Sequence, residues 1–156
     1  MQTNPLGVPA HQHPNGGGWV ADTATVDSTA YVGPDARVSG DASVYDNARV
    51  YGNARVSGDA RVSGNARVSG DANVSGDANV AVPQDHLLIG PIGSEDQFIT
   101  LARTETGHTL TIGCWQDHTV DELAAEVQRR APLHAAEYAA AEVLIRARIL
   151  SWETQA

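Results

Sequence analysis

The stretch that decides the fold lies at residues 50–61 and reads Val50-Tyr51-Gly52-Asn53-Ala54-Arg55-Val56-Ser57-Gly58-Asp59-Ala60-Arg61. It holds two copies of one hexapeptide, and the same unit recurs without a break from residue 20 to residue 82. Valine stands at every sixth position, and an alanine follows each of the first ten valines four places later. The valines are Val20, Val26, Val32, Val38, Val44, Val50, Val56, Val62, Val68, Val74 and Val80. A strict short period of this kind indicates a solenoid built from stacked repeats.

Each hexapeptide predicts one short strand and one bend. Successive side chains of a strand point to opposite faces, so Val56 shares the inner face with Ala54. Arg55 and Ser57 then point outward. The Gly-Asp or Gly-Asn pair that follows tolerates the backbone of a tight corner. One hexapeptide cannot bury its valine alone, so we expect the coils to stack until the valines form a continuous core.

These residues resemble the hexapeptide repeat of left-handed parallel β-helices, in which side chains three hexapeptides apart stack in columns on a triangular coil. The resemblance implies the left-handed sense, because general rules for parallel connections favour the opposite hand. Eleven hexapeptides make about 3.7 coils, a prism about 17 Å tall at the usual strand spacing of roughly 4.8 Å. We therefore expect a mainly β protein with a short left-handed parallel β-helix.

Three regions follow from the composition. Residues 1–19 are rich in Pro, Gly and His, and we expect them to form an N-terminal arm that caps the first coil. Residues 20–82 are the β-helix, and Pro83 ends it because proline has no backbone N–H for a strand ladder. Residues 84–156 lack the repeat and form a C-terminal α+β module, a β-hairpin followed by two helices.

The C-terminal module opens with apolar runs that are typical of strands. The runs are residues 87–89, 98–101 and 109–114. Thr106-Gly107 provides the turn of a hairpin between the last two runs. Thr119 and Glu122 have the spacing of a capping box, in which each side chain satisfies a free amide at a helix start. A first helix is therefore expected from Val120 to Arg130.

A second helix is expected to start near Pro132, because proline suits a first helical turn. Apolar residues along it recur at alternating spacings of three and four, the pattern of a narrow seam that packs on one neighbouring helix. They are Leu133, Ala136, Ala140, Val143, Ala147 and Leu150. The partner is either the first helix of the same chain or the same helix of another subunit, and packing within the chain is the simpler expectation.

Composition excludes several functional classes. The chain has 156 residues and a formal net charge of −9, whereas a general nucleic-acid surface is normally basic. No apolar run approaches the roughly 20 residues of a membrane span. The first residues lack the basic and apolar regions of a secretory signal, and the lone Cys114 excludes an internal disulfide framework. We expect a cytoplasmic protein.

Arginine and tyrosine mark the outer columns of the prism. Stacking by three hexapeptides places like charges only about 4.8 Å apart, where they repel unless an anion or a carboxylate lies between them. The predicted columns are Tyr31-Arg49-Arg67, Arg37-Arg55 and Ser43-Arg61. The corner residues Asp35, Asp41, Asp59 and Asp71 are alternative internal partners, and a solvated edge of mixed charge is the simplest interpretation.

The tyrosines favour a ligand-binding site, because packing of the core does not explain aromatic rings on the outer surface of an isolated prism. Aromatic faces stack on bases, and arginine forks bind phosphates in two-point contacts. In left-handed β-helix trimers, faces of neighbouring prisms line equivalent clefts. The candidate ligand-binding residues are Arg49, Arg55, Arg61, Arg67, Tyr31, Tyr45 and Tyr51.

Histidine placement bears on catalysis. The best-known hexapeptide-repeat proteins are trimeric acyltransferases and γ-type carbonic anhydrases, and both use histidine. None of the six histidines falls within residues 20–82, so we expect neither catalysis nor a metal or other cofactor. An acyltransferase with a base from the C-terminal module stays an alternative. His11 and His13 alone do not complete a metal site and are expected in solvent, and Cys114 is expected as a small buried hydrophobe.

The order of parts resembles small proteins encoded by tailed phages and prophages. The residues that carry this resemblance are Gly16-Gly17-Gly18-Trp19-Val20, the Ala-Arg-Val-Ser-Gly-Asp repeats, Ile112-Gly113-Cys114-Trp115 and Thr119-Val120-Asp121-Glu122-Leu123. The resemblance favours a non-enzymatic homotrimer in the cytoplasm of an infected host, which sequesters a small anionic nucleotide to neutralise host defence. A structural or protein-binding trimer is the alternative, and the helix seam allows higher assembly.

Overall fold

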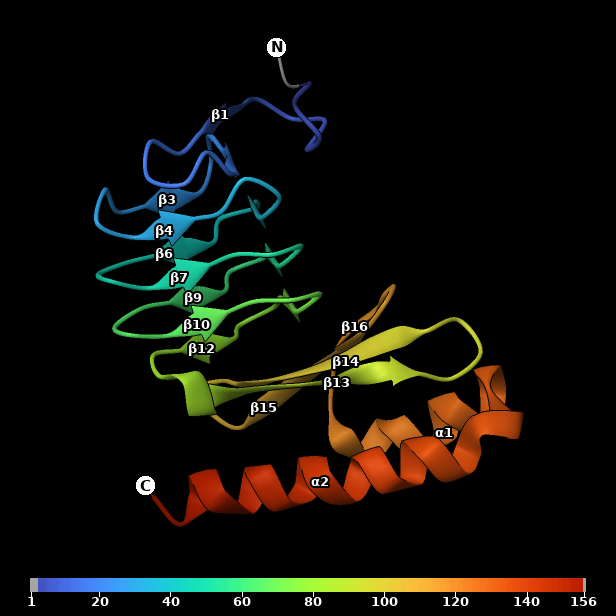
Figure 1. Cartoon of the computed structure of the whole chain (residues 1–156). Coiled ribbons are helices and arrows are strands. Elements are labelled where there is room, and N and C mark those ends of the chain that lie inside the picture. Colours follow the sequence, from blue (N-terminus) through green and yellow to red (C-terminus); the bar gives the residue numbers. More distant parts are fainter. Residues whose placement is uncertain (1–2, 156) are drawn as a thin grey trace.

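The hexapeptide repeat folds into a parallel β-solenoid in the computed structural model of the chain, which describes residues 3–155 (Figure 1). Each repeat contributes one strand of two or three residues that carries its valine. The strands are β2 Trp19–Ala21, β3 Thr25–Val26, β4 Tyr31–Val32, β5 Arg37–Val38, β6 Ser43–Val44, β7 Arg49–Val50, β8 Arg55–Val56, β9 Arg61–Val62, β10 Arg67–Val68, β11 Asn73–Val74 and β12 Asn79–Val80. This confirms the predicted repeat unit.

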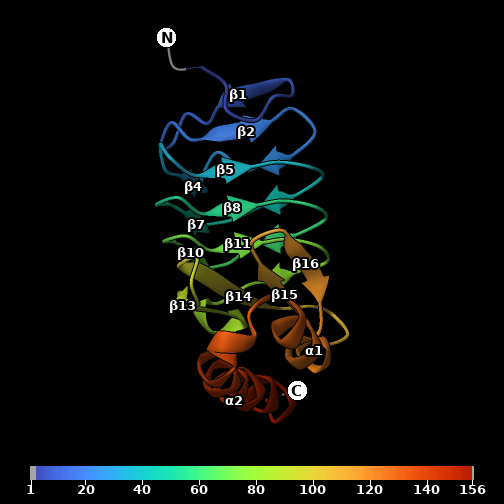
Figure 2. The ribbon, with the colours of Figure 1, turned by 90° about the vertical axis from the view of Figure 1, so that its right-hand side faces the viewer.

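Strands three repeats apart pair in parallel and form the three faces of a prism. The faces are β2-β5-β8-β11, β3-β6-β9-β12 and β4-β7-β10. Valine lies opposite valine in every parallel pair, as Val38 lies opposite Val56. The solenoid has about three turns, and its ladders run down the upper part of the molecule in Figure 2.

The core of the prism consists of the repeat valines and alanines. From residue 30 to residue 80 each of them has an exposed fraction of at most 1%. Glycine is required at the corners, as Gly58 shows, because its φ is +65° and a Cβ there would lie 2.9 Å from the backbone nitrogen of Gly76. The alternation of inward and outward side chains is therefore confirmed.

The N-terminal segment lies across the first turn of the prism. Strand β1 (Ala10–Gln12) pairs antiparallel with β2, and His11 lies opposite Val20. Close packing holds the following loop on the prism, because a Cβ on Gly18 would clash with the carbonyl oxygen of Gly33. His13 is buried in this loop and is not in solvent as expected, since its ring contacts the backbone of Asn15.

A four-stranded antiparallel sheet closes the other end of the prism. The chain leaves β12 through the short 3-10 helix η1 (Pro83–Asp85) and then forms β13 (His86–Ile92), β14 (Gln97–Arg103), β15 (His108–Ile112) and β16 (Trp115–His118). The predicted hairpin is β14 and β15. Asn73 of β11 donates its backbone N–H to the hydroxyl of Thr100 at 2.9 Å, so one face of the sheet contacts the last turn of the prism.

Two helices cover the opposite face of this sheet (Figure 1). Helix α1 (Val120–Arg130) begins with the predicted capping box, because the backbone N–H of Thr119 donates to the Glu122 carboxylate at 2.8 Å. A 3-10 turn, η2 (Pro132–His134), leads into α2 (Ala135–Glu153). Within residues 3–155 no helix has the length and apolar character needed to cross a bilayer.

The seam predicted on the second helix does not pack within the chain. Helix α2 buries Tyr138, Ala141, Ile145 and Trp152, while all six seam residues are exposed. Leu133 is 95% exposed, Val143 70% and Leu150 60%. The expectation of intramolecular packing is therefore wrong for this seam, because larger side chains on the opposite side of α2 occupy the contact with the sheet.

Candidate functional site

Strand register brings the first predicted column together on one face of the prism. Tyr31 of β4 lies opposite Arg49 of β7, and Arg49 lies opposite Arg67 of β10. Their side chains point outward because the neighbouring valines occupy the core. The sequence spacing placed these three residues in this order, and the register agrees.

Arg49 lies beside two aromatic rings. Its guanidinium carbon is 5.1 Å from the centroid of the Tyr31 ring and 6.0 Å from that of Tyr51. An exposed cation–π contact of this kind contributes about 0.5–1 kcal/mol. Tyr51 lies beside Arg49 because the residue one turn earlier, Gly33, has no side chain. A Cβ on Gly33 would lie 3.1 Å from the Tyr51 Cβ. We call Tyr31, Arg49, Tyr51 and Arg67 the Arg/Tyr surface.

Carboxylates do not neutralise the arginines of this surface. Within residues 3–155, four prism arginines form no ion pair; they are Arg37, Arg49, Arg55 and Arg67. The corner aspartates Asp35, Asp41, Asp59 and Asp71 are in no ion pair of the same residues either. Arg49 and Arg67 therefore present cationic groups one rung apart that are open to an anion from outside.

The other three candidates lie elsewhere on the prism. Arg55 belongs to the face of β2-β5-β8-β11, where it lies opposite Arg37. Arg61 belongs to the face of β3-β6-β9-β12, and Tyr45 follows β6 on that side. One chain therefore gathers four of the seven candidates on one side of the prism, and the remaining three lie on its other two faces.

The surroundings of Arg61 do not favour an anion. It lines a groove of about 610 Å³ between the prism and the C-terminal sheet, together with the acidic side chains Asp59, Asp77, Glu105 and Asp117. Its guanidinium lies 3.8 Å from the Glu105 carboxylate, and both side chains are exposed. A phosphate entering this groove would meet more carboxylates than guanidinium groups.

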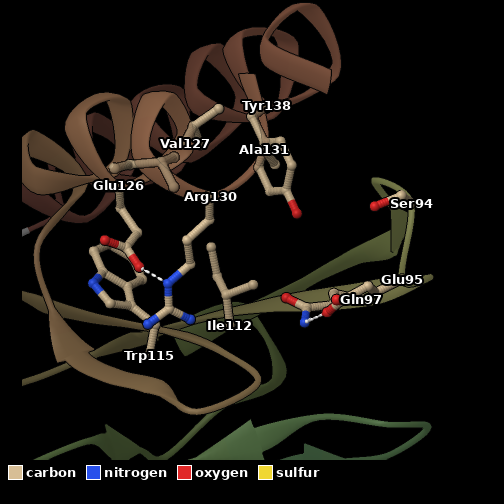
Figure 3. Close-up of a pocket in the computed structure, with 11 residues that line it drawn as sticks. Ser94, Glu95, Gln97, Ile112, Trp115, Glu126, Val127, Arg130, Ala131 and Tyr138 are labelled. Atoms are coloured by element: carbon tan, nitrogen blue, oxygen red, sulfur yellow. Dashed lines mark hydrogen bonds and ion pairs between the residues drawn. The ribbon is translucent and has the colours of Figure 1, made fainter. Parts of the chain in front are cut away.

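A second cavity, of about 290 Å³, lies between the C-terminal sheet and the helices (Figure 3). Ile112, Trp115 and Val127 form its apolar wall, and the Tyr138 hydroxyl points toward the loop that carries Ser94. Burial, followed by the charges of Glu137 and Glu95, raises the pKa of Tyr138. The sequence did not predict this cavity, because its walls come from a sheet and two helices whose packing no local pattern specifies.

The charged groups Glu126 and Arg130, which line this cavity, pair with each other, and Arg129 beside them joins the pair. Arg130 forms an ion pair with Glu126, and Arg129 does so at 2.8 Å. Hydrogen bonds to Arg129 hold the pKa of Glu126 below its usual range. The cavity suits a small, weakly polar molecule better than an anion, since Arg130 already has a carboxylate partner.

Cys114 is exposed in the turn between β15 and β16, and the expectation that it is buried is wrong. The turn is tight, because Gly113 has φ +56° and the chain reverses within two residues. Arg130 Nη1 donates to the Cys114 sulfur at 3.5 Å. His118, four residues after Cys114, stacks on Trp115 with ring centroids 4.3 Å apart and contacts Glu122 at 3.1 Å.

The histidines are engaged separately across the molecule. His11 contacts the Asp22 carboxylate at 2.9 Å on the surface of the N-terminal segment. Desolvation and the nearby Arg148 charge lower the pKa of His86, while desolvation lowers that of His108. Within the part of the chain that the structure describes, no group of three or more His, Cys, Asp or Glu side chains is arranged to hold a metal ion.

Comparison with known families supports the repeat. The family model described as the YdcK beta solenoid repeat matches residues 42–58, 48–62 and 60–76. The matched segments all lie in the prism and include Arg49, Arg55 and Arg67. Searches of curated proteins and of solved structures find no match. The chain is thus similar to a β-solenoid repeat family over residues 42–76 of the prism.

Proposed function

We propose that this chain is a non-enzymatic binding protein that assembles as a homotrimer and holds a small anionic nucleotide between prism faces. The observation that carries the proposal is the Arg/Tyr surface, in which Arg49 lies beside two tyrosine rings and one rung from Arg67. Guanidinium groups bind phosphate oxygens, and tyrosine faces stack on bases. Groups that bind phosphates and groups that stack on bases therefore lie within one small area of the surface.

A neighbouring subunit supplies the missing wall. The Arg/Tyr surface lies on a flat prism face, where a bound nucleotide would keep most of its area in water. Ligand sites normally enclose most of the ligand. When faces of two prisms meet, Arg55 or Tyr45 of one copy lies toward the Arg/Tyr surface of the next copy. The contact then brings together candidate residues that lie on different faces of a single chain.

The resemblance to phage-encoded proteins favours a role for this binding during infection of a host. A phage protein that binds a nucleotide without converting it lowers the free concentration of that nucleotide in the host cytoplasm. The proposed ligand is therefore a nucleotide immune signal with at least two phosphates, since Arg49 and Arg67 offer two cationic groups about one strand spacing apart.

Calorimetry of a charge-matched pair of variants tests the proposal. We expect the wild type to bind a member of a panel of cyclic di- and trinucleotides and ADP-ribose derivatives. Changing Arg49 and Arg67 to Gln should weaken that binding at least about tenfold, or roughly 1.4 kcal/mol. The control changes Arg129 and Arg130 to Gln, which removes the same charge from α1, and should leave binding unchanged.

Each other outcome favours a different function. No heat from any of these nucleotides with the wild type would overturn their sequestration and favour a structural or protein-binding trimer. A loss of binding only in the Arg129/Arg130 variant would indicate that the ligand binds in the cavity of Figure 3. Consumption of acetyl-CoA with an acceptor would favour an acyltransferase.

A further inference from the structure

Helix α2 carries apolar residues on two opposite sides. One side repeats every seven residues, at Tyr138, Ile145 and Trp152, and is buried against the sheet and α1. The other side is the exposed seam, with Leu133 in η2 and the rest in α2. The seam residues are Leu133, Ala136, Ala140, Val143, Ala147 and Leu150. A helix that is apolar on both sides is normally covered on both sides.

The orientation of α2 is fixed, so the seam cannot turn inward. Arg148 Nη1 donates to the backbone carbonyl of His86 at 2.9 Å, and the Trp152 indole N–H donates to that of Gln84 at 2.9 Å. These bonds tie the C-terminal half of α2 to η1 and to the start of β13. Figures 1 and 2 show α2 running across the axis of the prism at the end of the molecule, with no other element of residues 3–155 beyond it.

We propose that the seam pairs with the seam of a second copy of this chain, antiparallel, about a two-fold axis between Ala140 and Val143. The residue order is close to a palindrome, which an isologous contact requires. In this register Leu133 packs on Leu150 of the second copy, Ala136 on Ala147, and Ala140 on Val143. Small residues in the middle let the helix axes approach to about 8 Å, the short end of the usual range.

The absence of charge along the seam and the residues beside it support the self-pairing. Each copy has a formal net charge of −9, yet no charged residue occupies a seam position. Leu144 is 49% exposed beside the seam, and the two-fold axis brings it near Leu144 of the second copy. The seam is thus an uncharged strip on an acidic protein, which suits an apolar partner of the same kind.

The contact area predicts a reversible dimer. From Leu133 to Leu150 the seam extends about 25 Å at 1.5 Å per residue, and a helix is about 10 Å wide. The contact therefore covers about 250 Å² on each copy and about 500 Å² in total, below the roughly 1,200 Å² of a stable specific interface. We expect association that rises with protein concentration, with the two prisms pointing away from each other and their faces free.

A charge exchange between two variants tests both the pairing and its register. Ala140→Arg and Val143→Glu each place like charges close to the two-fold axis, and each alone should raise the dissociation constant at least about tenfold. Mixed together, the two variants should associate again, because the introduced guanidinium of one copy then faces the introduced carboxylate of the other. Sedimentation over a concentration series measures all four samples, with circular dichroism to verify that both exposed substitutions preserve the fold.

Two results would overturn the proposal. If the wild type and Ala140→Arg have the same mass at every concentration, the seam does not pair with itself. If the mixture associates no better than its components, the antiparallel register is wrong. Salt separates this contact from nucleotide binding, because screening weakens repulsion between acidic copies and strengthens pairing, whereas it weakens phosphate binding. Either proposal can therefore fail without the other.

Discussion

The backbone N–H of Val120 donates a hydrogen bond of 3.0 Å to Nε2 of His108. Val120 is the first residue of α1, so an imidazole on β15 satisfies one of the free amides of the helix start. The imidazole can accept this bond only when Nε2 carries no proton. The neutral form of His108 is therefore part of the contact between the sheet and the helix layer.

Acidification should loosen this contact. Desolvation holds the pKa of His108 below its ordinary value of about 6.5, which it regains on unfolding. Above pH 6.5 both states are neutral, whereas below it the unfolded chain binds a proton that the folded chain resists, so stability falls as the pH drops. His86 adds the same trend because its pKa is also lowered.

Thermal melts between pH 7.5 and 5.5 measure this effect. His108→Gln keeps an acceptor for Val120 and removes the titration, so its melting temperature should depend less on pH than that of the wild type. Equal pH dependence of the two proteins would show that His108 does not contribute to it.

Substitutions at inward and at outward positions of the prism should differ strongly in their effect on stability. Val56 is fully buried and Ser57, its neighbour, points outward. Val56→Asp places a charge without a partner between stacked turns and should cost several kcal/mol. Ser57→Asp introduces the same group on the surface and should change stability by no more than about 0.5 kcal/mol. Denaturant unfolding of both variants makes the comparison, and similar midpoints would contradict the burial of this ladder.

The repeat was predictable because one pattern specifies both local and long-range structure. A period of six fixes which side chain enters the core, and stacking by three repeats then fixes the order Tyr31, Arg49, Arg67. The second helix was different. Its sequence has two apolar stripes, and only the packing of Tyr138 and Trp152 against the sheet decides which one is buried.

Local pattern also failed at the turn between β15 and β16. Strand β16 reads Trp115-Gln116-Asp117-His118, with a single apolar residue, so no alternation marks it as a strand. Asp117 has φ +62°, a left-handed conformation that the residues around it do not predict. The exposure of Cys114 follows from this turn and could not be read from the residues alone.

Close packing of the N-terminal segment should make Gly18 intolerant of a side chain. A Cβ at this position would clash with the Gly33 carbonyl oxygen and would lie 2.5 Å from Val32 Cγ1, both in the prism. Gly18→Ala should therefore lift the segment from the first turn at a cost of about 1–3 kcal/mol. Gly107→Ala is the matched control, because no atom of the described residues beyond its two chain neighbours lies within 4 Å of the Cβ that the alanine adds.

Hydrogen exchange resolves this effect from global unfolding. In Gly18→Ala the amides of β1 and β2 should lose protection, whereas those of the C-terminal sheet should keep it. Unchanged protection of β1 would mean that the segment does not rely on this contact.

Assembly through the prism faces is the condition for the proposed nucleotide site. A solenoid of about three turns has a small core for its exposed surface, and its flat faces offer area to bury against other copies. Ala140→Arg blocks the seam on α2, so any remaining association must use other surfaces. Light scattering of this variant should give about 49 kDa, three times the chain mass of 16.4 kDa. A stable mass of one chain at micromolar concentration would remove the cleft between subunits, and the Arg/Tyr surface would then have to bind its anion from a single open face.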